Sequence, residues 1–281
     1  MIVHQLALRF RAPDRPGILA AITPLLARHS CDVRDAQVYG DPDTHNFFVR
    51  MVLASPLTTS ELAILIEPVA LSLDLQWELL DLARQLRVLI AISKFGHCLI
   101  DLLHKHEIGE LPIKIVGVVS NHDAMRRTTE WHDLPYHHLS MDIGKAAQEA
   151  QFLQIVEDSS ADLVVLARYM QILSDGFSAR LQGRCINIHH SFLPSFKGAK
   201  PYHQAHRRGV KLIGATAHYV TAELDEGPII EQDVRRVTHA ATADAVVAAG
   251  LEVEASVLSR AVRWHAEHRI FLNGNKTVVL G

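Results

Sequence analysis

Residues 88–93 read Val-Leu-Ile-Ala-Ile-Ser and open a series of short apolar segments that decides the fold of most of the chain. The series continues with IKIVGVVSN at 113–121, DLVVLARYM at 162–170 and CINIH at 185–189. The first segment is continuously apolar and the others are largely so, which is typical of strands buried on both faces. Helix-like segments such as 144–157 separate them. The pattern therefore predicts an α/β domain with a mainly parallel sheet.

The first 84 residues follow another pattern and predict a separate, smaller domain. Strand candidates and helix candidates occur there in the order βαββαβ, which is the ferredoxin-like arrangement. We therefore expect one domain at 1–84 and a second at 85–281. The second domain is expected to end in a long helix over 240–268 and a hairpin around Asn273-Gly274.

Composition narrows the functional classes. Of 281 residues, 48% are hydrophobic and 21% charged, with a net charge of -3, so a general binder of nucleic acid or of membrane surfaces is not indicated. The three cysteines, Cys31, Cys98 and Cys185, are odd in number and far apart, which fits a reducing compartment. The amino-terminal residues lack the pattern of a signal peptide. We expect a soluble, cytoplasmic protein.

Polar side chains that can move an acyl group occur after the last apolar segment. Asn187 and His189 are two residues apart, so on a strand their side chains point the same way. Asp225 precedes Gly227-Pro228 in a turn-like stretch. An amide can stabilise an oxyanion, while an imidazole and a carboxylate can move protons. Spacing alone leaves two alternatives open: Asn187 and His189 can be a structural polar pair, and Asp225 can belong to an ordinary turn.

The amino-acid sequences of both motifs resemble those of the formyltransferase family that uses 10-formyltetrahydrofolate. NIHHSFLPSFKG at 187–198 and LDEGPII at 224–230 carry the resemblance, which spans roughly 87–281. It implies a Rossmann-like formyltransferase domain in which Asn187, His189 and Asp225 are catalytic. It also implies a pterin pocket between the loop that follows residues 162–166 and the facing segment 222–225. The implied pocket residues are Met170, Gln171, Ile172, Leu173, Ala222 and Leu224; ordinary core is the alternative for the apolar ones.

The amino-terminal domain resembles the ACT family of small-molecule sensors. The resemblance rests on Asp14, Arg15, Pro16 and Gly17, which match the turn between the first strand and the first helix. Amino acids bind at this turn in many ACT domains, and the family suggests glycine or methionine as the effector. A tight structural turn is the alternative. Because such domains usually cover their sheet edges by pairing, a homo-oligomer is expected, either dimer or tetramer.

The acceptor of the formyl group depends on the loop at 93–99, SKFGHCL. It has one glycine and bulky neighbours, which argues against a phosphate-bearing acceptor. With an ACT domain attached, it resembles the hydrolytic members of the family, in which Lys94 and His97 contribute to the substrate site. Those enzymes cleave 10-formyltetrahydrofolate to tetrahydrofolate and formate, balancing the one-carbon folate pool and supplying formate for purine biosynthesis. Phe95-Gly96 and Lys200 depart from that pattern on the acceptor side.

Two other functions stay open. One is a formyltransferase acting on an amine without phosphate, such as an amino sugar, and the other is a catalytically silent folate or amino-acid sensor. The intact trio of Asn187, His189 and Asp225 argues against a pure sensor. The 18 histidines include pairs at 137–138 and 189–190, but no HExxH or Cys/His ligand set accompanies them. We therefore expect no metal and no permanently bound cofactor.

Overall fold

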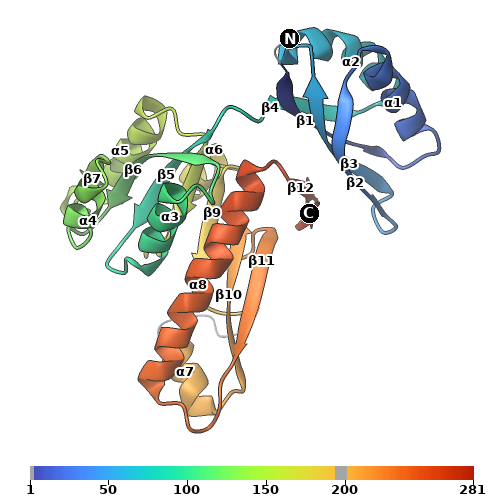
Figure 1. Ribbon diagram of the computed structural model, residues 1–281. Helices are drawn as coiled ribbons and strands as arrows, with labels where there is room; N and C mark the ends of the chain where they lie inside the picture. The colour runs from blue at the N-terminus through green and yellow to red at the C-terminus, as the bar shows by residue number, and fades with distance from the viewer. Residues whose placement is uncertain (1–2, 194–200) are drawn as a thin grey trace. The chain divides into compact units, whose positions relative to one another are not determined.

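The computed structural model describes residues 3–193 and 201–281, so the expectation about Lys200 falls outside the described residues. The chain divides into two compact units. The small unit contains Met1–Gln85 together with Glu267–Asn273 and Thr277–Gly281, and the large unit contains Leu86–Ala266 with Gly274–Lys276. Figure 1 shows the chain from the amino-terminal strands in blue to the carboxyl-terminal segments in red.

The small unit has the predicted βαββαβ order. Its elements are β1 (His4–Pro13), α1 (Ile18–Arg28), β2 (Asp32–Asp41), β3 (Asn46–Ser55), α2 (Thr59–Leu73) and β4 (Gln76–Asp81). The strands form one antiparallel sheet in the order β2-β3-β1-β4. Alternate residues of β1, such as Leu6 and Leu8, pack against Ile22 of α1 and Ile66 of α2. Both helices therefore cover one face of the sheet, as a period of two along the strand requires.

The other face of this sheet is covered by the end of the chain. Phe271 of β12 (Ile270–Asn273) packs edge-on against Phe48 of β3, with the ring centroids 5.5 Å apart. Leu280, just after β13 (Lys276–Val279), joins the same buried cluster. The expected boundary placed all of 85–281 in one domain, whereas residues 267–273 and 277–281 belong to the small unit. Burial of these apolar side chains against the open sheet face explains the difference.

The large unit is built on a seven-stranded sheet in the order β11-β10-β9-β8-β5-β6-β7. Its strands are β5 (Leu86–Ile92), β6 (Ile113–Ser120), β7 (Tyr136–His138), β8 (Leu163–Leu166), β9 (Cys185–His189), β10 (Leu212–Tyr219) and β11 (Ile229–Arg236). Strands β5 to β9 pair in parallel, as predicted, while β10 and β11 run antiparallel. A mainly parallel sheet is thus confirmed, extended by an antiparallel pair at one edge.

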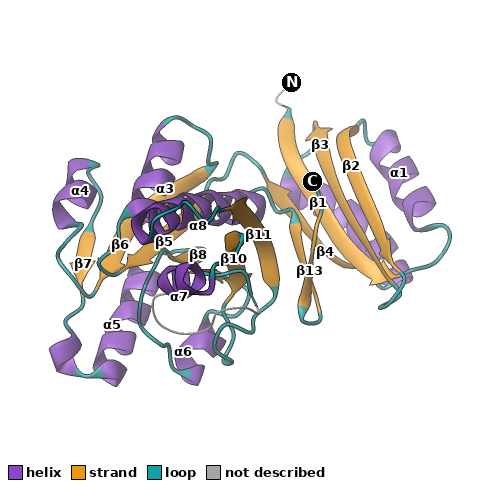
Figure 2. Ribbon diagram, turned by 90° about the horizontal axis from the view of Figure 1, so that it is seen from below, coloured by secondary structure: helices purple, strands orange, loops and turns teal. Residues whose placement is uncertain are grey.

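Helices cover both faces of the large sheet (Figure 2). They are α3 (His97–Glu107), α4 (Arg126–Trp131), the 3₁₀ turn η1 (Met141–Ile143), α5 (Lys145–Asp158), α6 (Asp175–Arg180), α7 (Pro201–Arg208) and α8 (Ala243–Ala266). Phe152 of α5 and Phe177 of α6 pack against Leu89 and Leu166 on one face. The long helix α8 lies against β10 and β11 and contacts α3. Among the described helices, none combines the length and apolarity needed to cross a membrane.

The carboxyl-terminal segment is expected to stabilise the small unit through Phe271. Its ring is 3% exposed, and the Arg9 guanidinium lies 4.4 Å from the ring centroid. Phe271→Ala should lower the free energy of unfolding of the small unit by about 3–5 kcal/mol, the usual cost of deleting a buried phenyl ring. Hydrogen exchange of the β1 amides measures this change. Leu272→Ala, which alters a side chain that is 39% exposed, is the matched control and should have little effect.

Candidate active site

A cavity of ≈ 840 Å³ lies in the large unit where β8 and β9 end. In parallel sheets, ligands bind outside the carboxyl ends of the strands, and this cavity has that position. Asn187 and His189 line it from β9, two residues apart on the same side of the strand. Asp225 lines it from the loop between β10 and β11. The three residues selected from the sequence therefore share one cavity.

The turn that carries Asp225 is closed by a glycine. A Cβ atom on Gly227 would overlap the carbonyl oxygen of Tyr219 at the end of β10, so a larger residue cannot occupy this position. The Tyr219 amide donates to the Pro228 carbonyl across the same turn. Asp225 itself has a φ of 58°, in the left-handed region that aspartate tolerates better than most residues. This geometry fixes where the carboxylate points.

The Asp225 carboxylate lies between two imidazole rings. His189 Nδ1 is 3.3 Å from Asp225 Oδ2, and His218 Nε2 is 3.7 Å from Asp225 Oδ1. His218 Nδ1 lies 2.9 Å from the Tyr219 carbonyl oxygen, which can only accept, so Nδ1 carries the proton. In the neutral ring Nε2 then accepts from Asn187 Nδ2, 3.2 Å away. His218 thereby orients the Asn187 amide, whose second N–H is left for a ligand.

These contacts determine the charge of Asp225. Burial alone would raise the pKa of Asp225, but the hydrogen bond from His189, together with the nearby His218 ring, outweighs it and holds the pKa well below the ordinary value. Asp225 is consequently an ionised carboxylate at neutral pH. His189 donates to it through Nδ1, so Nε2 is the nitrogen that remains to interact with a substrate; this atom is buried and has no hydrogen-bond partner among the described residues.

The remaining walls of the cavity are mostly apolar. They include all of the expected pterin-pocket residues, namely Met170, Gln171, Ile172, Leu173, Ala222 and Leu224. Met170 and Ile172 are 52% and 65% exposed, so they are not the ordinary core that was the alternative, whereas Leu173 packs against the buried cluster below the cavity. The loop is anchored where the Met170 amide donates to Ser93 Oγ, 3.0 Å away. Exposed apolar side chains on an anchored loop can grip the faces of a flat heterocycle.

Two expected substrate-site residues lie elsewhere. Lys94 is exposed and is not among the residues that line the cavity. His97, at the start of α3, directs Nε2 to Glu254 Oε2, 2.9 Å away, instead of into the cavity. Phe95, between them, does line the cavity. His97 points away from the cavity because the carboxylate of Glu254 on α8 is fully buried and requires nearby hydrogen-bond donors.

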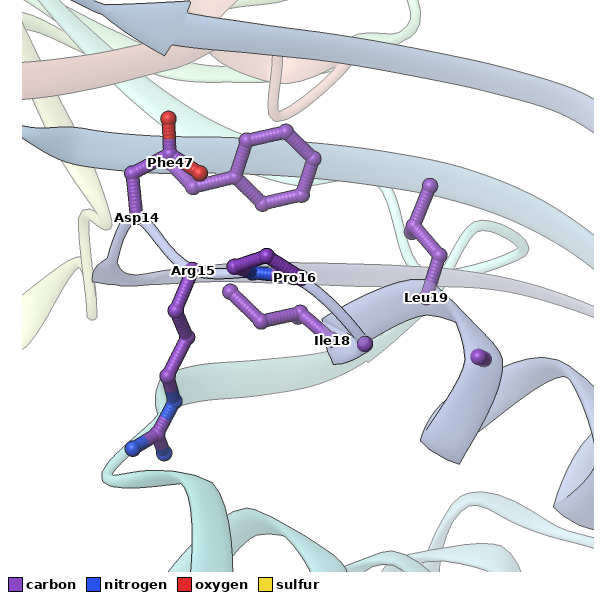
Figure 3. A pocket seen from close by; sticks show the side chains of 8 residues that line it. Asp14, Arg15, Pro16, Ile18, Leu19 and Phe47 are labelled. Atoms are coloured by element: carbon purple, nitrogen blue, oxygen red, sulfur yellow. The ribbon is translucent and has the colours of Figure 1, made fainter.

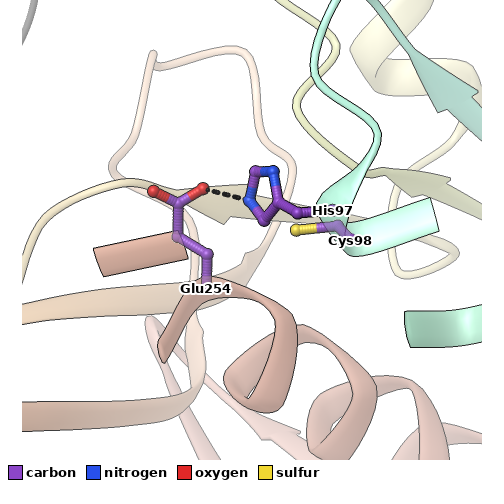
Figure 4. A group of neighbouring side chains, drawn as sticks. All are labelled: His97, Cys98 and Glu254. Carbon is purple, nitrogen blue, oxygen red and sulfur yellow. Dashed lines mark hydrogen bonds and ion pairs between the residues drawn. The ribbon is translucent and has the colours of Figure 1, made fainter. Parts of the chain in front are cut away.

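Four side chains gather around this buried carboxylate. Besides His97, Tyr202 donates its hydroxyl to Glu254 Oε1 over 2.8 Å, and Arg168 Nε lies 3.4 Å from Oε2. Cys98 lies beside them, and its Sγ falls within 4.8 Å of the ligand atoms of His97 and Glu254 (Figure 4). Arg168 and Tyr202 also line the cavity that holds Asn187, His189 and Asp225, so this cluster forms one of its walls.

The His97–Cys98–Glu254 group fits an ion-pair network better than a metal centre. Burial raises the pKa of Cys98 well above its ordinary value, followed in importance by the nearby Glu254 charge, so the thiol keeps its proton. The Arg168 guanidinium already lies against the same carboxylate and would repel a cation. Burial raises the pKa of Glu254, but its hydrogen bond with His97 and the Arg168 charge more than compensate, leaving it ionised.

Sequence reasoning missed His218, Glu254 and Tyr202. His218 stands opposite Asn187 in the β9–β10 ladder. The sequence pattern does not predict β10 as a strand, so it gives no indication that His218 and Asn187 are neighbours. A charged residue on the apolar face of a helix was the available signal for Glu254, which sits on α8 among Val253, Val257 and Leu258. Such a residue needs a buried partner.

A second cavity, of ≈ 640 Å³, lies in the small unit at the start of α1. It is lined by Asp14, Arg15, Pro16 and Gly17, the four residues expected to bind an effector, together with Phe47 of β3. Gly17 has a φ of 97°, and no side chain caps the helix there. Figure 3 shows Asp14 beside Phe47, with Arg15 extending away from both. The loop thus combines backbone donors with charges of both signs.

Comparison with known proteins places the chain in a family. A formyl transferase family model matches residues 86–262, and an ACT domain model matches residues 7–59. A relative from Corynebacterium sp. (strain P-1), named formyltetrahydrofolate deformylase, is 48% identical over 277 residues, which is 97% of each chain. The chain belongs to the formyltetrahydrofolate deformylase family. The predicted ACT and formyltransferase domains are confirmed.

Solved structures separate the deformylase family from its relatives. The crystal structure of formyltetrahydrofolate deformylase from Burkholderia mallei is 51% identical, with a TM-score of 0.94 over 99% of this chain and 100% of that one. Glycinamide ribonucleotide transformylase 1 from Symbiobacterium toebii is 29% identical, with a TM-score of 0.65 over 70% of this chain and 95% of that one. The deformylase likeness therefore spans both units, whereas the transformylase likeness covers a smaller share of the chain.

His190, the residue after β9, is expected to make stability depend on pH. Burial, then the charges of Arg168 and His189, lowers the pKa of His190 from 6.5 to about 4. The unfolded chain thus binds more protons between these values, and the free energy of unfolding should fall by on the order of 2 kcal/mol as pH drops from 6.5 toward 4. Urea unfolding at several pH values measures it. His190→Asn should flatten this dependence, whereas His104→Asn, at an exposed position, should not.

Proposed function

We propose that this protein hydrolyses 10-formyltetrahydrofolate to tetrahydrofolate and formate. The observation that carries the proposal is the convergence of Asn187, His189 and Asp225 in one cavity whose other walls suit a flat heterocycle. Membership of the deformylase family supports the same reaction. Such an activity balances the one-carbon folate pool and supplies formate for purine biosynthesis.

The proposed reaction begins with a water molecule attacking the formyl carbon on N10. The ionised Asp225 carboxylate accepts a hydrogen bond from this water and assists removal of its proton. The carbonyl oxygen becomes an oxyanion, which receives hydrogen bonds from the free N–H of Asn187 and from the Nε2–H of a His189 ring that is protonated on both nitrogens. His218 keeps the Asn187 amide in the required orientation. These donors stabilise the transition state more than the ground state, which is the requirement for catalysis.

Collapse of the tetrahedral intermediate requires a proton on N10, because an amide-type nitrogen is a poor leaving group as an anion. The proton taken from water is shared by Asp225 and His189, whose titrations are coupled by their 3.3 Å contact. Transfer from this pair to N10 breaks the C–N bond and releases formate. Each step uses side chains of this cavity, and we propose that the enzyme needs no resident metal or cofactor and works in the cytoplasm.

Formate release in the absence of any amine tests this function. Purified protein should consume 10-formyltetrahydrofolate and release one formate per substrate without an added acceptor. Asp225→Asn should lower kcat by about 10²–10⁴-fold, because the variant lacks the carboxylate that accepts the proton. Absorbance of the folate, together with a formate assay, measures both quantities.

The matched control is Glu226→Gln, which removes the neighbouring exposed carboxylate that does not line the cavity. It should retain nearly full activity. Formate release that requires an added amine would contradict the hydrolytic proposal and favour formyl transfer. Near-normal turnover of Asp225→Asn would contradict the role of this carboxylate.

We further propose that an amino acid, glycine or methionine, binds the small-unit cavity and regulates the enzyme. A carboxylate fits the exposed backbone N–H groups at the start of α1, and Asp14 is available for an ammonium group. We also propose a homo-oligomer, because β2 is an edge strand with Val38 and Tyr39 exposed. Regulation requires the effector to bind active and inactive states with different affinities.

Titration with each amino acid tests the regulatory proposal. Glycine or methionine should change the rate of formate release in a saturable manner, and Asp14→Ala should abolish that response because the ammonium partner is lost. Asp32→Ala, at an exposed site on β2 of the same unit, is the control and should preserve the response. If neither amino acid alters the rate or binds to the protein, these two effectors are excluded.

A further inference from the structure

Arg168 has an unusual position at the end of β8. Its side chain is only 9% exposed, and the residue lines the catalytic cavity. The backbone there has a φ of 68°, in the left-handed region that arginine rarely adopts. Directly before it, the Ala167 amide donates to the Ala91 carbonyl and ties the chain to β5. Strain of this kind persists where neighbouring structure enforces it, often at functional sites.

The guanidinium is held on one side and unsatisfied on the other. Nε lies 3.4 Å from Glu254 Oε2, and the centre of the group lies 5.5 Å from the centroid of the Phe95 ring. Nη1 and Nε are both buried and have no hydrogen-bond partner among the described residues, so the contact of Nε with Glu254 is an ion pair only. The Glu254 oxygens bond to His97 and Tyr202, and among the described residues neither forms a hydrogen bond with Nη1. A buried charged donor without a partner is costly, which indicates an anionic ligand.

The position of Arg168 relates this unsatisfied donor to the reaction. Its charge lowers the pKa of His190, which adjoins His189, so the cation acts at the end of β9 that carries the catalytic histidine. His190 is therefore neutral at neutral pH, and the positive charge at this end of β9 comes from Arg168. Hydrolysis of a formyl group yields a planar carboxylate, whereas transfer to an amine yields a neutral amide. A guanidinium edge matches a carboxylate in shape and charge.

We propose that Arg168, oriented by Glu254, forms the subsite of the cavity that binds formate. Glu254 is a positioning residue, since it acts through Arg168. The inference rests on the proposed hydrolysis and adds a specificity determinant to it: a cation at this wall favours an anionic product and disfavours a protonated amine as acceptor. The carboxylate that forms when the water bound at Asp225 has attacked receives the Nη1 hydrogen bond.

The test is direct binding of ¹³C-labelled sodium formate to the full chain without folate, followed by NMR relaxation. Formate should bind the wild type, and formamide, its neutral analogue, should bind at least about tenfold more weakly. Arg168→Met should weaken formate binding by about tenfold or more and leave formamide binding unchanged. Arg168→Lys keeps the charge without the planar edge and should lie between the two. Glu254→Gln, which removes the positioning charge, should also weaken formate binding.

Arg180→Met is the matched control, because Arg180 on α6 is 60% exposed and does not line the cavity. It should bind formate like the wild type. Equal binding of formate and formamide by the wild type, or unchanged formate affinity in Arg168→Met, overturns the proposal. The comparison of formate with formamide uses wild-type protein and does not depend on how the variants fold. Because no folate is present, failure here is distinct from failure to hydrolyse 10-formyltetrahydrofolate.

Discussion

The contact between the Asp225 carboxylate and the His189 ring, 3.3 Å apart, is the interaction on which the geometry of the cavity in the large unit depends. It joins the end of a central parallel strand to the turn before an antiparallel edge strand. The turn can approach so closely because Gly227 lies against the Tyr219 carbonyl with no room for a Cβ atom. One backbone constraint therefore sets the position, the charge and the proton partner of the carboxylate.

A second charge, that of Glu254, organises the opposite wall. It is fully buried, and a buried carboxylate is stable only with well-placed donors. It is contacted by His97 from the start of α3, Arg168 from the end of β8 and Tyr202 from α7. Segments far apart in the sequence are thereby brought to one wall of the cavity. The same demand explains why His97 faces into the protein and Arg168 faces the site.

The parts of the fold and site that depend on local patterns were predictable. Continuous apolar segments predicted the parallel strands, because a strand buried on both faces has no polar side. Asn187 and His189 were placed on one side of β9 by the period of two along a strand. His218 was not predictable in this way, because its role depends on standing opposite Asn187 in a ladder between β9 and β10, which are separated in the sequence by residues 190–211.

Periodicity and the residues of short motifs are enough to predict two domains of known type, the parallel strands of the central sheet and the three polar residues Asn187, His189 and Asp225. Folding of the whole chain is needed to bring the last residues onto the small unit and to bring His97, Arg168 and Tyr202 to Glu254. The physical reason is that burial of an apolar face or of a charge is satisfied by whichever partner the whole fold brings near. The spacing of residues along the sequence does not identify that partner.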